Sequence, residues 1–136
     1  MGSLPHSWAE GDKITIASRS DFGDSQYTFI VNRYVFTVIE GPDIGRVLEL
    51  KVGKTYLGRQ PTEEESSRIY RWVLIDKTVS RTHAELCLAD PGVPVLRHLS
   101  ATNDTFVNGR KIVEENLQDG QVIQMGQTAI VMETSR

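Results

Sequence analysis

The sequence predicts an all-β protein, an antiparallel β-sandwich with its ligand site on the loops at one end. Three observations support this fold class. From Tyr34 onward, short runs rich in β-branched and aromatic residues alternate with turn signals. No segment of about ten residues or more follows the period of a helix. Hydrophobic residues make up 39% and charged residues 24% of the 136 residues, proportions that are ordinary for a globular domain.

The predicted strands follow one another closely along the chain. Each is a short apolar run bounded by glycine, proline, aspartate or asparagine, the residues that favour turns. The sequence DPG at 90–92 is an example, because proline presets φ and glycine tolerates a positive value. We expect strands at 34–40, 46–50, 54–59, 72–75, 83–89, 93–99, 105–109, 120–126 and 128–133.

The first 33 residues differ from the rest of the chain. They contain scattered glycine, serine and aspartate and show no sustained period, although residues 26–31 alternate like a strand. We expect this strand to pack on the sandwich or to join its edge. The predicted organisation is an N-terminal extension at 1–33, acting as a docking or regulatory tail, and one folded domain at 34–134. Because the chain ends just after its last strand, we expect it to be a piece of a longer protein.

Composition excludes several classes of function. The single cysteine, Cys87, rules out an internal disulfide framework, and with three histidines no metal cluster is expected. The formal net charge of −3 argues against nucleic acid or an anionic membrane as a partner. The apolar runs are too short to span a bilayer, and no secretory signal is visible. We therefore expect a cytoplasmic protein without a metal or cofactor.

Three loop segments hold unusual sets of polar residues. They are LGRQ at 57–60, SRTH at 80–83 and SATNDTFVNG at 100–109. Loops at one end of a sandwich commonly hold the functional residues, since the strands beneath them form a rigid support. The candidate binding residues in these segments are Arg59, Ser80, Arg81, Thr102 and Asn103.

This set of side chains suits a phosphorylated peptide. Arginine presents a charged, planar fork of donors that matches phosphate oxygens two at a time. The hydroxyls of serine and threonine can donate to the remaining oxygens, and an asparagine amide can bridge a peptide backbone. Catalysis is not expected, because Ser80 and His83 lack a nucleophile elbow and an evident acidic partner.

The three motifs, in this order, resemble the signature of the forkhead-associated (FHA) domain family over about residues 34–133. The resemblance implies a module that binds phosphothreonine in preference to phosphoserine, with the third residue after it tuning selectivity. It implies that Arg59 binds the phosphate and supports the adjacent peptide backbone. Ser80 would donate its hydroxyl to the phosphate, and Arg81 would add contacts to phosphate or peptide. Thr102 would line the pocket near the phosphothreonine methyl, and Asn103 would hold the main chain of the ligand.

The resemblance also implies supporting residues and shows departures from the family pattern. Gly58 would allow close backbone packing, while His83, Asn108 and Gly109 would brace the loops. Asp104 stands where the family usually has glycine, so we expect a left-handed backbone there and a negative charge beside the phosphate. His98 and Ala101 replace residues that are commonly aspartate and serine. The loop between Gln60 and Arg71 is longer than usual and acidic, and we expect its sequence TEEESS to be a solvated loop.

Two further hypotheses follow from the resemblance. The expected partner is a phosphothreonine-containing protein, bound in cis or in trans after action of a Ser/Thr kinase. The module would then regulate an attached or partner effector, such as a nucleotide cyclase or kinase. Its own tail is one possible ligand, with Thr15 preferred over Thr28 because Thr28 lies in the more strand-like segment. The alternative is a degenerate FHA domain, a phosphate-independent interaction or dimerisation module, which the charge of Asp104 keeps open.

Overall fold

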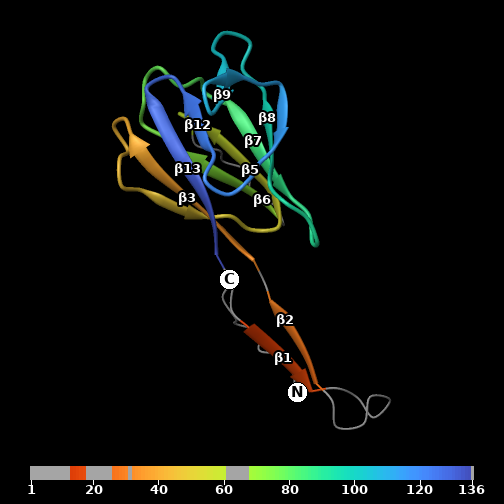
Figure 1. Ribbon diagram of the computed structural model, residues 1–136. Coiled ribbons are helices and arrows are strands. Elements are labelled where there is room, and N and C mark those ends of the chain that lie inside the picture. The colour runs from red at the N-terminus through yellow and green to blue at the C-terminus, as the bar shows by residue number, and fades with distance from the viewer. Residues whose placement is uncertain (1–12, 18–25, 31, 61–67, 136) are drawn as a thin grey trace.

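The computed structural model describes residues 13–17, 26–30, 32–60 and 68–135, and it has the predicted β-sandwich architecture (Figure 1). The described residues contain no helix. A six-stranded sheet has the order β10-β9-β12-β13-β3-β4, and a five-stranded sheet has the order β11-β8-β7-β5-β6. The strands of the six-stranded sheet are β3 (Arg33–Glu40), β4 (Val47–Glu49), β9 (Thr105–Val107), β10 (Arg110–Lys111), β12 (Val122–Met125) and β13 (Thr128–Ser135). Those of the five-stranded sheet are β5 (Gly53–Gly58), β6 (Ile69–Val73), β7 (Ala84–Leu88), β8 (Val95–His98) and β11 (Glu114–Asn116).

The core lies between the two sheets and follows from alternation along the strands. In β3, Tyr34, Phe36 and Val38 are buried, while the residues between them are only partly covered. Successive side chains of a strand point to opposite faces, so one face of β3 packs inward. The fully buried side chains that this core collects from both sheets include Phe36, Leu57, Leu74, Leu86, Leu96, Ile123, Met125, Ile130 and Met132. Burial of this apolar surface is the main stabilising contribution to the sandwich.

Strand register brings distant segments of the chain to one end of the five-stranded sheet. Ala84, at the start of β7, pairs with Leu57 near the end of β5 and with His98 at the end of β8. At the other end of the same strands, Gly53 pairs with Leu88. Because these neighbouring strands are antiparallel, the segments after β5, before β7 and after β8 must meet. They form the upper end of the sandwich in Figure 1.

Two expectations for the five-stranded sheet were wrong. The sheet is mixed, because β6 pairs with β5 in parallel, from Lys54 with Ile69 to Gly58 with Val73. The first residue of β6, Ile69, lies opposite Lys54 near the start of β5, so the two strands run in the same direction, whereas a tight hairpin after β5 would have reversed it. The strand expected at 72–75 therefore starts at Ile69 and ends at Val73. The TEEESS segment of this connection lies outside the described residues.

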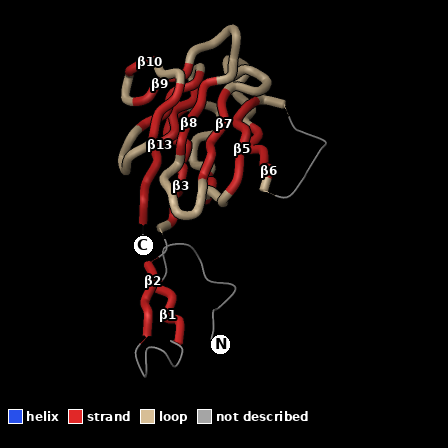
Figure 2. The backbone as a smooth tube through the Cα atoms, turned by 90° about the vertical axis from the view of Figure 1, so that its right-hand side faces the viewer, coloured by secondary structure: helices blue, strands red, loops and turns tan. Residues whose placement is uncertain are grey.

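The strand expected at 26–31 does not join the sandwich, which corrects our prediction. β2 (Gln26–Ile30) pairs with β1 (Lys13–Ala17) in a separate two-stranded sheet. The strand was correctly expected, but its partner was missed, and pairing with β1 satisfies backbone groups that would otherwise seek a sheet edge. Both views show this hairpin projecting from the end of the sandwich where β3 begins (Figures 1 and 2).

Two short strands of the sandwich, β10 and β11, were not predicted. β10 pairs with β9, and β11 pairs with β8, so both lie at sheet edges. The sequence of β11, Glu114 to Asn116, contains no apolar residue and therefore lacks the alternation on which the prediction depended. Edge strands commonly carry charged side chains, which discourage pairing with another molecule.

Candidate functional site

An open hollow of about 370 Å³ lies at the end of the sandwich where β5, β7 and β8 meet. Its walls are residue 59 and two loop segments, 77–82 and 99–103. The structure brings all five sequence-predicted binding residues to this hollow. The lining residues are Arg59, Lys77, Val79, Ser80, Arg81, Thr82, Leu99, Ser100, Ala101, Thr102 and Asn103.

Backbone pairing beyond the end of β5 places Arg59 beside Ser80. The amide of Arg59 donates to the carbonyl of Ser80 at 3.1 Å, and the amide of Gln60 donates to that of Arg81 at 3.2 Å. Gly58 is required for this approach, because a Cβ at that position would lie 1.9 Å from the carbonyl oxygen of Arg81. The glycine therefore has the close-packing role that the resemblance implied.

The side chain of Arg59 is exposed and anchored at one point. Its Nε donates to the carbonyl oxygen of Val79 at 2.7 Å, which orients the guanidinium over the segment that contains Ser80. Neither terminal nitrogen bonds to another residue that the structure describes. An arginine held in this way presents a fork of donors to a ligand without first having to order its side chain.

A hydroxyl network connects the two loop segments, and Ser100 is its centre. The Oγ of Ser100 accepts hydrogen bonds from the amides of Thr102 and Asn103, at 3.2 and 3.0 Å. It also lies 2.6 Å from the Oγ of Ser80, which accepts a bond from the Asn103 side-chain amide at 2.8 Å. Sequence reasoning placed Ser100 in the third motif but gave it no role, since serine is common in turns.

The network determines which way the hydroxyl protons point. A hydroxyl has two lone pairs and one hydrogen, and both lone pairs of Ser100 are used by backbone amides. Two hydroxyl oxygens lie within reach of the Ser100 hydrogen, that of Ser80 at 2.6 Å and that of Thr102 at 3.5 Å. The shorter distance favours Ser80 as the acceptor, and the lone pairs of Ser80 are then taken by Ser100 and Asn103. The hydrogen of Ser80 remains available. Ser80 is thus prepared to donate to an acceptor in the hollow, and an anion is the natural acceptor.

His83 is fully buried and connects four parts of the chain. Its Nδ1 accepts from the amide of Ser80 at 3.1 Å, so Nε2 carries the proton and donates to the carbonyl of Asp104 at 2.9 Å. The backbone of His83 bonds to Leu57, Leu99 and Ser100. Burial, together with the nearby His98, holds the pKa of His83 below its ordinary value of 6.5, although the bond to Asp104 opposes this. A neutral His83 is therefore part of the loop framework.

Asp76 fixes the loop that leads to Ser80, and sequence reasoning missed it. The side chain is buried, and its Oδ1 accepts from the amide and hydroxyl of Thr78 at 2.8 and 2.6 Å. Its Oδ2 accepts from the amide of Gln127 at 3.0 Å and the hydroxyl of Thr128 at 2.7 Å. Burial alone would raise the pKa of Asp76, but these four bonds hold it below 3.8. The carboxylate thereby ties the 77–78 turn to the β12–β13 turn.

The expected consequences of Asp104 are not found in the structure. The only non-glycine residues with positive φ in the described part of the chain are Arg68 and Asn108, so Asp104 is not left-handed. Its carboxylate lies 3.4 Å from Nζ of Lys111 and does not line the hollow. The left-handed conformation falls instead on Asn108 and Gly109, which turn β9 into β10. The Asn108 side chain also accepts from the amide of Val122 at 2.8 Å, bracing this turn.

The other two departures from the family pattern have ordinary places. The Nδ1 of His98 lies 2.7 Å from the hydroxyl of Thr105, which is fully buried. Ala101 is exposed and lines the hollow. Neither position brings a negative charge to the site.

Two cations near the site were also missed. Lys77 lines the hollow directly before the TVSRTH sequence. Arg71, on β6, donates through Nη1 to the carbonyl of Gln60 at 3.0 Å and to the hydroxyl of Thr82 at 3.2 Å. Its guanidinium also lies 5.6 Å from the centre of the Tyr56 ring. The proximity of Lys77 to the second motif was a usable signal, whereas the position of Arg71 depends on the parallel pairing of β6.

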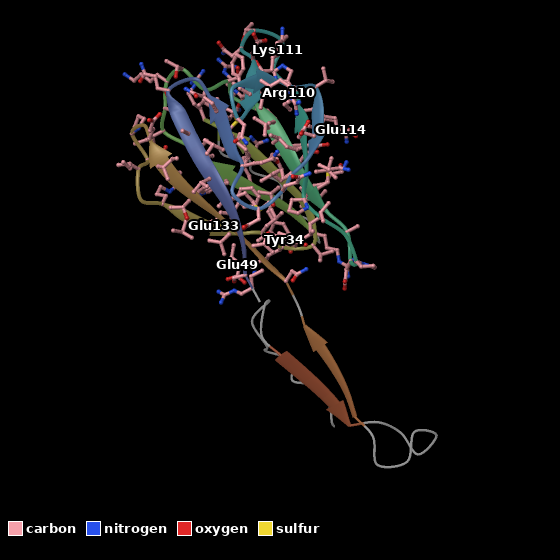
Figure 3. The ribbon with its side chains drawn as sticks, viewed as in Figure 1. Tyr34, Glu49, Arg110, Lys111, Glu114 and Glu133 are labelled. Atoms are coloured by element: carbon pink, nitrogen blue, oxygen red, sulfur yellow. The ribbon has the colours of Figure 1, made fainter. Side chains whose placement is uncertain are left out.

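The two candidate phosphorylation sites lie away from the hollow. Thr15 and Thr28 are paired with each other across the β1–β2 hairpin. The hairpin leaves the sandwich near Tyr34, whose hydroxyl donates to the carbonyl of Gly92 at 3.1 Å, in the β7–β8 connection. Figure 3 shows Arg110 and Lys111 at one end of the sandwich and Tyr34 and Glu49 toward the other, beside the hairpin. The hollow lies at the end away from Gly92, where β7 begins and β8 ends.

The residues at 13–17, 26–30, 32–60 and 68–135 hold neither a metal cluster nor a membrane-spanning helix. These residues contain no group of three or more His, Cys, Asp or Glu side chains placed to hold a metal ion. Nor do they include a helix of the length and apolar character needed to cross a bilayer.

Comparison with known proteins gives one consistent family. The FHA domain family model matches residues 55–126. The FHA domain-containing protein FhaA of Mycobacterium tuberculosis is 34% identical over 88 residues, which cover 65% of this chain and 15% of that protein. The chain thus spans only a small part of the length of that relative.

Solved structures agree with this match. The FHA domain of the CT664 protein from Chlamydia trachomatis superposes with a TM-score of 0.63 at 27% identity, covering 74% of this chain and 96% of that one. A structure described as an analysis of phosphothreonine-dependent FHA domain interactions has a TM-score of 0.59 at 31% identity, covering 74% and 95%. The chain belongs to the FHA domain family, whose members are binding modules.

Proposed function

We propose that this FHA domain binds phosphothreonine-containing peptides in the hollow at the end of the sandwich. One observation carries the proposal: Arg59, Ser80, Arg81, Thr102 and Asn103, which come from three separate motifs, line a single hollow. Among the described residues, no carboxylate lines it. A phosphorylated side chain brings a charge of about −1.5 to −2 near neutral pH, which this set of donors and cations complements.

The roles follow from the contacts already described. Arg59 supplies its terminal nitrogens, since only its Nε is used within the described residues. Ser80 supplies the hydroxyl hydrogen that the network leaves available. Thr102 and Asn103 lie on the wall formed by residues 99–103 and would contact the ligand beside the phosphate. Several charge-assisted bonds, offset by the loss of freedom on association, suit a micromolar affinity, about −8 kcal/mol.

The comparison with solved FHA domains supports the choice of phosphothreonine. One similar structure comes from a study of phosphothreonine-dependent interactions, and another is the FhaA domain in complex with an intracellular protein domain. The alternative, a phosphate-independent interaction module, depended on the charge of Asp104. That carboxylate is paired with Lys111 and lies outside the lining, so the observation that favoured the alternative is weakened.

Titration with matched peptides tests the proposal. Three peptides that differ only in Thr, phosphothreonine or phosphoserine at one position would be measured by fluorescence anisotropy. We expect micromolar binding of the phosphothreonine peptide and much weaker binding of the other two. Equal affinities for Thr and phosphothreonine would instead establish the phosphate-independent module. Asp104→Asn should change the phosphothreonine affinity by less than about twofold, because the exposed Asp104–Lys111 pair is outside the hollow.

We further propose that a phosphorylated N-terminal segment of a second copy is one ligand of this site. The hairpin pairs Thr15 with Thr28 and lies at the opposite end of the domain from the hollow, so binding within one molecule would require the two strands to separate. This pairing also removes the reason for preferring Thr15. Intact-mass measurement with light scattering of phosphorylated wild type, Thr15→Ala and Thr28→Ala would identify the site. An unchanged oligomeric state after phosphorylation would contradict this ligand without affecting peptide binding.

We propose that the domain is the regulatory part of a longer signalling protein in the cytoplasm. The match to 15% of FhaA is consistent with a module that is joined to other segments. A Ser/Thr kinase would generate its ligand, and an attached or partner effector, such as a nucleotide cyclase or kinase, would respond. Copurification of the full-length protein with phosphothreonine-containing partners, abolished by phosphatase treatment, is the expected result.

A further inference from the structure

Lys77 is the charged residue of the hollow to which the proposed function assigns no role. It lies on the wall that also carries Ser80 and Arg81, and its side chain is exposed. No ion pair joins it to a carboxylate in the described part of the chain. A lysine at the edge of an anion site is commonly only a solvated surface charge. A binding role for Lys77 therefore has to follow from its position and from the balance of charges around the hollow.

The position of Lys77 is set by a buried anchor. Its neighbours in sequence are Asp76, which is 1% exposed, and Thr78, whose amide and hydroxyl both bond to that carboxylate. The same carboxylate is bonded to Gln127 and Thr128 on the β12–β13 turn. The backbone that carries Lys77 is therefore held on both sides. The ammonium group of Lys77 can therefore reach only positions beside the mouth of the hollow that lie within the length of its side chain.

The charges around the hollow exceed what one phosphate requires. Arg59, Lys77 and Arg81 each carry a positive charge there. The two nearest carboxylates in sequence are already committed, because Asp76 is buried with both oxygens bonded and Asp104 is paired with Lys111. A phosphothreonine supplies about two negative charges at most, which leaves a cationic surplus on the 77–82 wall. This surplus occurs in a chain whose formal net charge is −3, so it is local.

We infer that the hollow selects phosphothreonine peptides that carry a second anionic group within a few residues, which Lys77 contacts. The inference depends on the proposed function and specifies its ligand class. A carboxylate side chain or a second phosphate has the required chemistry. Exposed pairs of this kind contribute up to roughly 1 kcal/mol, so a preference of about two- to fivefold in Kd is expected, decreasing with salt.

The test uses the whole chain and a set of phosphothreonine peptides. In each peptide, one of the three residues on either side of the phosphothreonine is Glu, Gln or phosphoserine, the last arm distinguishing a carboxylate from a phosphate source. At least one position should bind with Glu or phosphoserine about two- to fivefold more tightly than with Gln at low salt. Lys77→Met should remove that preference while keeping the affinity for the Gln peptides within about twofold.

Lys54→Met is the matched control, because Lys54 is an exposed lysine near the opposite end of β5. It removes the same charge, and the preference should survive it. Equal binding of the Glu, Gln and phosphoserine peptides, or a preference that persists in Lys77→Met, would overturn the inference and leave phosphothreonine binding intact. Failure of every phosphothreonine peptide to bind would overturn the proposed function and this inference together.

Discussion

The rim of the hollow and the base beneath it use polar residues in opposite ways. The rim residues Arg59, Arg81, Thr102 and Asn103 are exposed, and several of their donors have no partner among the described residues. The base residues Asp76 and His83 are 1% and 0% exposed, and every polar atom of their side chains is bonded. This difference indicates that the donors on the rim remain available for a ligand because the buried groups hold in place the loops that carry them. Rim changes should therefore affect affinity, and base changes should affect stability.

The largest effect is expected from Arg59→Ala, which removes the guanidinium fork from the rim. Binding of a phosphothreonine peptide should weaken by about 2–3 kcal/mol, and the free energy of unfolding should stay within about 0.5 kcal/mol of wild type. Calorimetric titration and urea unfolding measure the two quantities. Arg110→Ala is the control, because Arg110 is an exposed arginine paired with Glu115 and outside the lining. An equal loss of affinity in both variants would show that any exposed arginine contributes equally, and that Arg59 has no special role on the rim.

Asp76→Asn tests the base. The amide has one acceptor oxygen where the carboxylate has two, so donors from Thr78, Gln127 and Thr128 cannot all be satisfied. We expect a loss of about 2 kcal/mol in the free energy of unfolding, measured with urea at neutral pH. The exposed Glu40 at the end of β3 offers a matched control, since Glu40→Gln should change stability by less than about 0.5 kcal/mol.

The pH dependence of stability sharpens the same comparison, because the pKa of His83 is lowered by burial. In the unfolded chain this histidine takes up a proton near pH 6.5, whereas in the folded chain it stays neutral to a lower pH. The stability that the neutral, buried His83 contributes is therefore fully present above pH 6.5. Stability should fall as the pH falls from 6.5 toward the lower pKa of the folded state, with a slope below about 1.4 kcal/mol per pH unit. Urea midpoints of the unliganded protein, at pH 7.5 and below, measure it without the phosphate.

Two variants identify the histidine that causes the pH dependence of stability. His98 is only partly buried, and His98→Gln should keep most of the slope, whereas His83→Gln should flatten it. The lowered pKa of Asp76 acts in the same direction but only below pH 3.8, so the two windows are separate. A flat stability profile between pH 7.5 and pH 5 in wild type would show that the framework tolerates a charged His83.

The smallest effect is expected from Ser100→Ala, at the boundary between rim and base. Loss of its hydroxyl releases the amides of Thr102 and Asn103 and removes the hydrogen bond that Ser80 accepts from Ser100. Affinity for a phosphothreonine peptide should fall by about 1 kcal/mol through poorer ordering of the loop. Ser100→Thr retains a hydroxyl and should recover most of the affinity. Unchanged binding in Ser100→Ala would mean that the loop is ordered by its ligand instead.

Much of the fold and of the site was predictable from local patterns. Alternation predicted β3 and β13, because one face of each is buried against the core. Turn chemistry predicted the ends of β7 and β9, where DPG and NG follow. The five residues proposed for binding, which line one hollow, were predictable because their chemistry is concentrated in three short motifs. The hairpin partner of β2, the parallel strand β6 and the polar strand β11 were missed or misplaced, since pairing partners leave no local signal in the residues that pair.

The sequence by itself determined the sandwich, the motifs and the chemistry of the proposed ligand, because residue types and their spacing carry that information. Only the tertiary structure decided which side chains are committed and which remain available. Asp104 is turned to Lys111, Ser100 directs the proton of Ser80, and Asp76 anchors the turn that carries Lys77. Each of these contacts joins residues whose positions relative to one another depend on strand register or turn geometry. A hydrogen bond depends on distances of a few tenths of an ångström, and only the packed sheets set those distances.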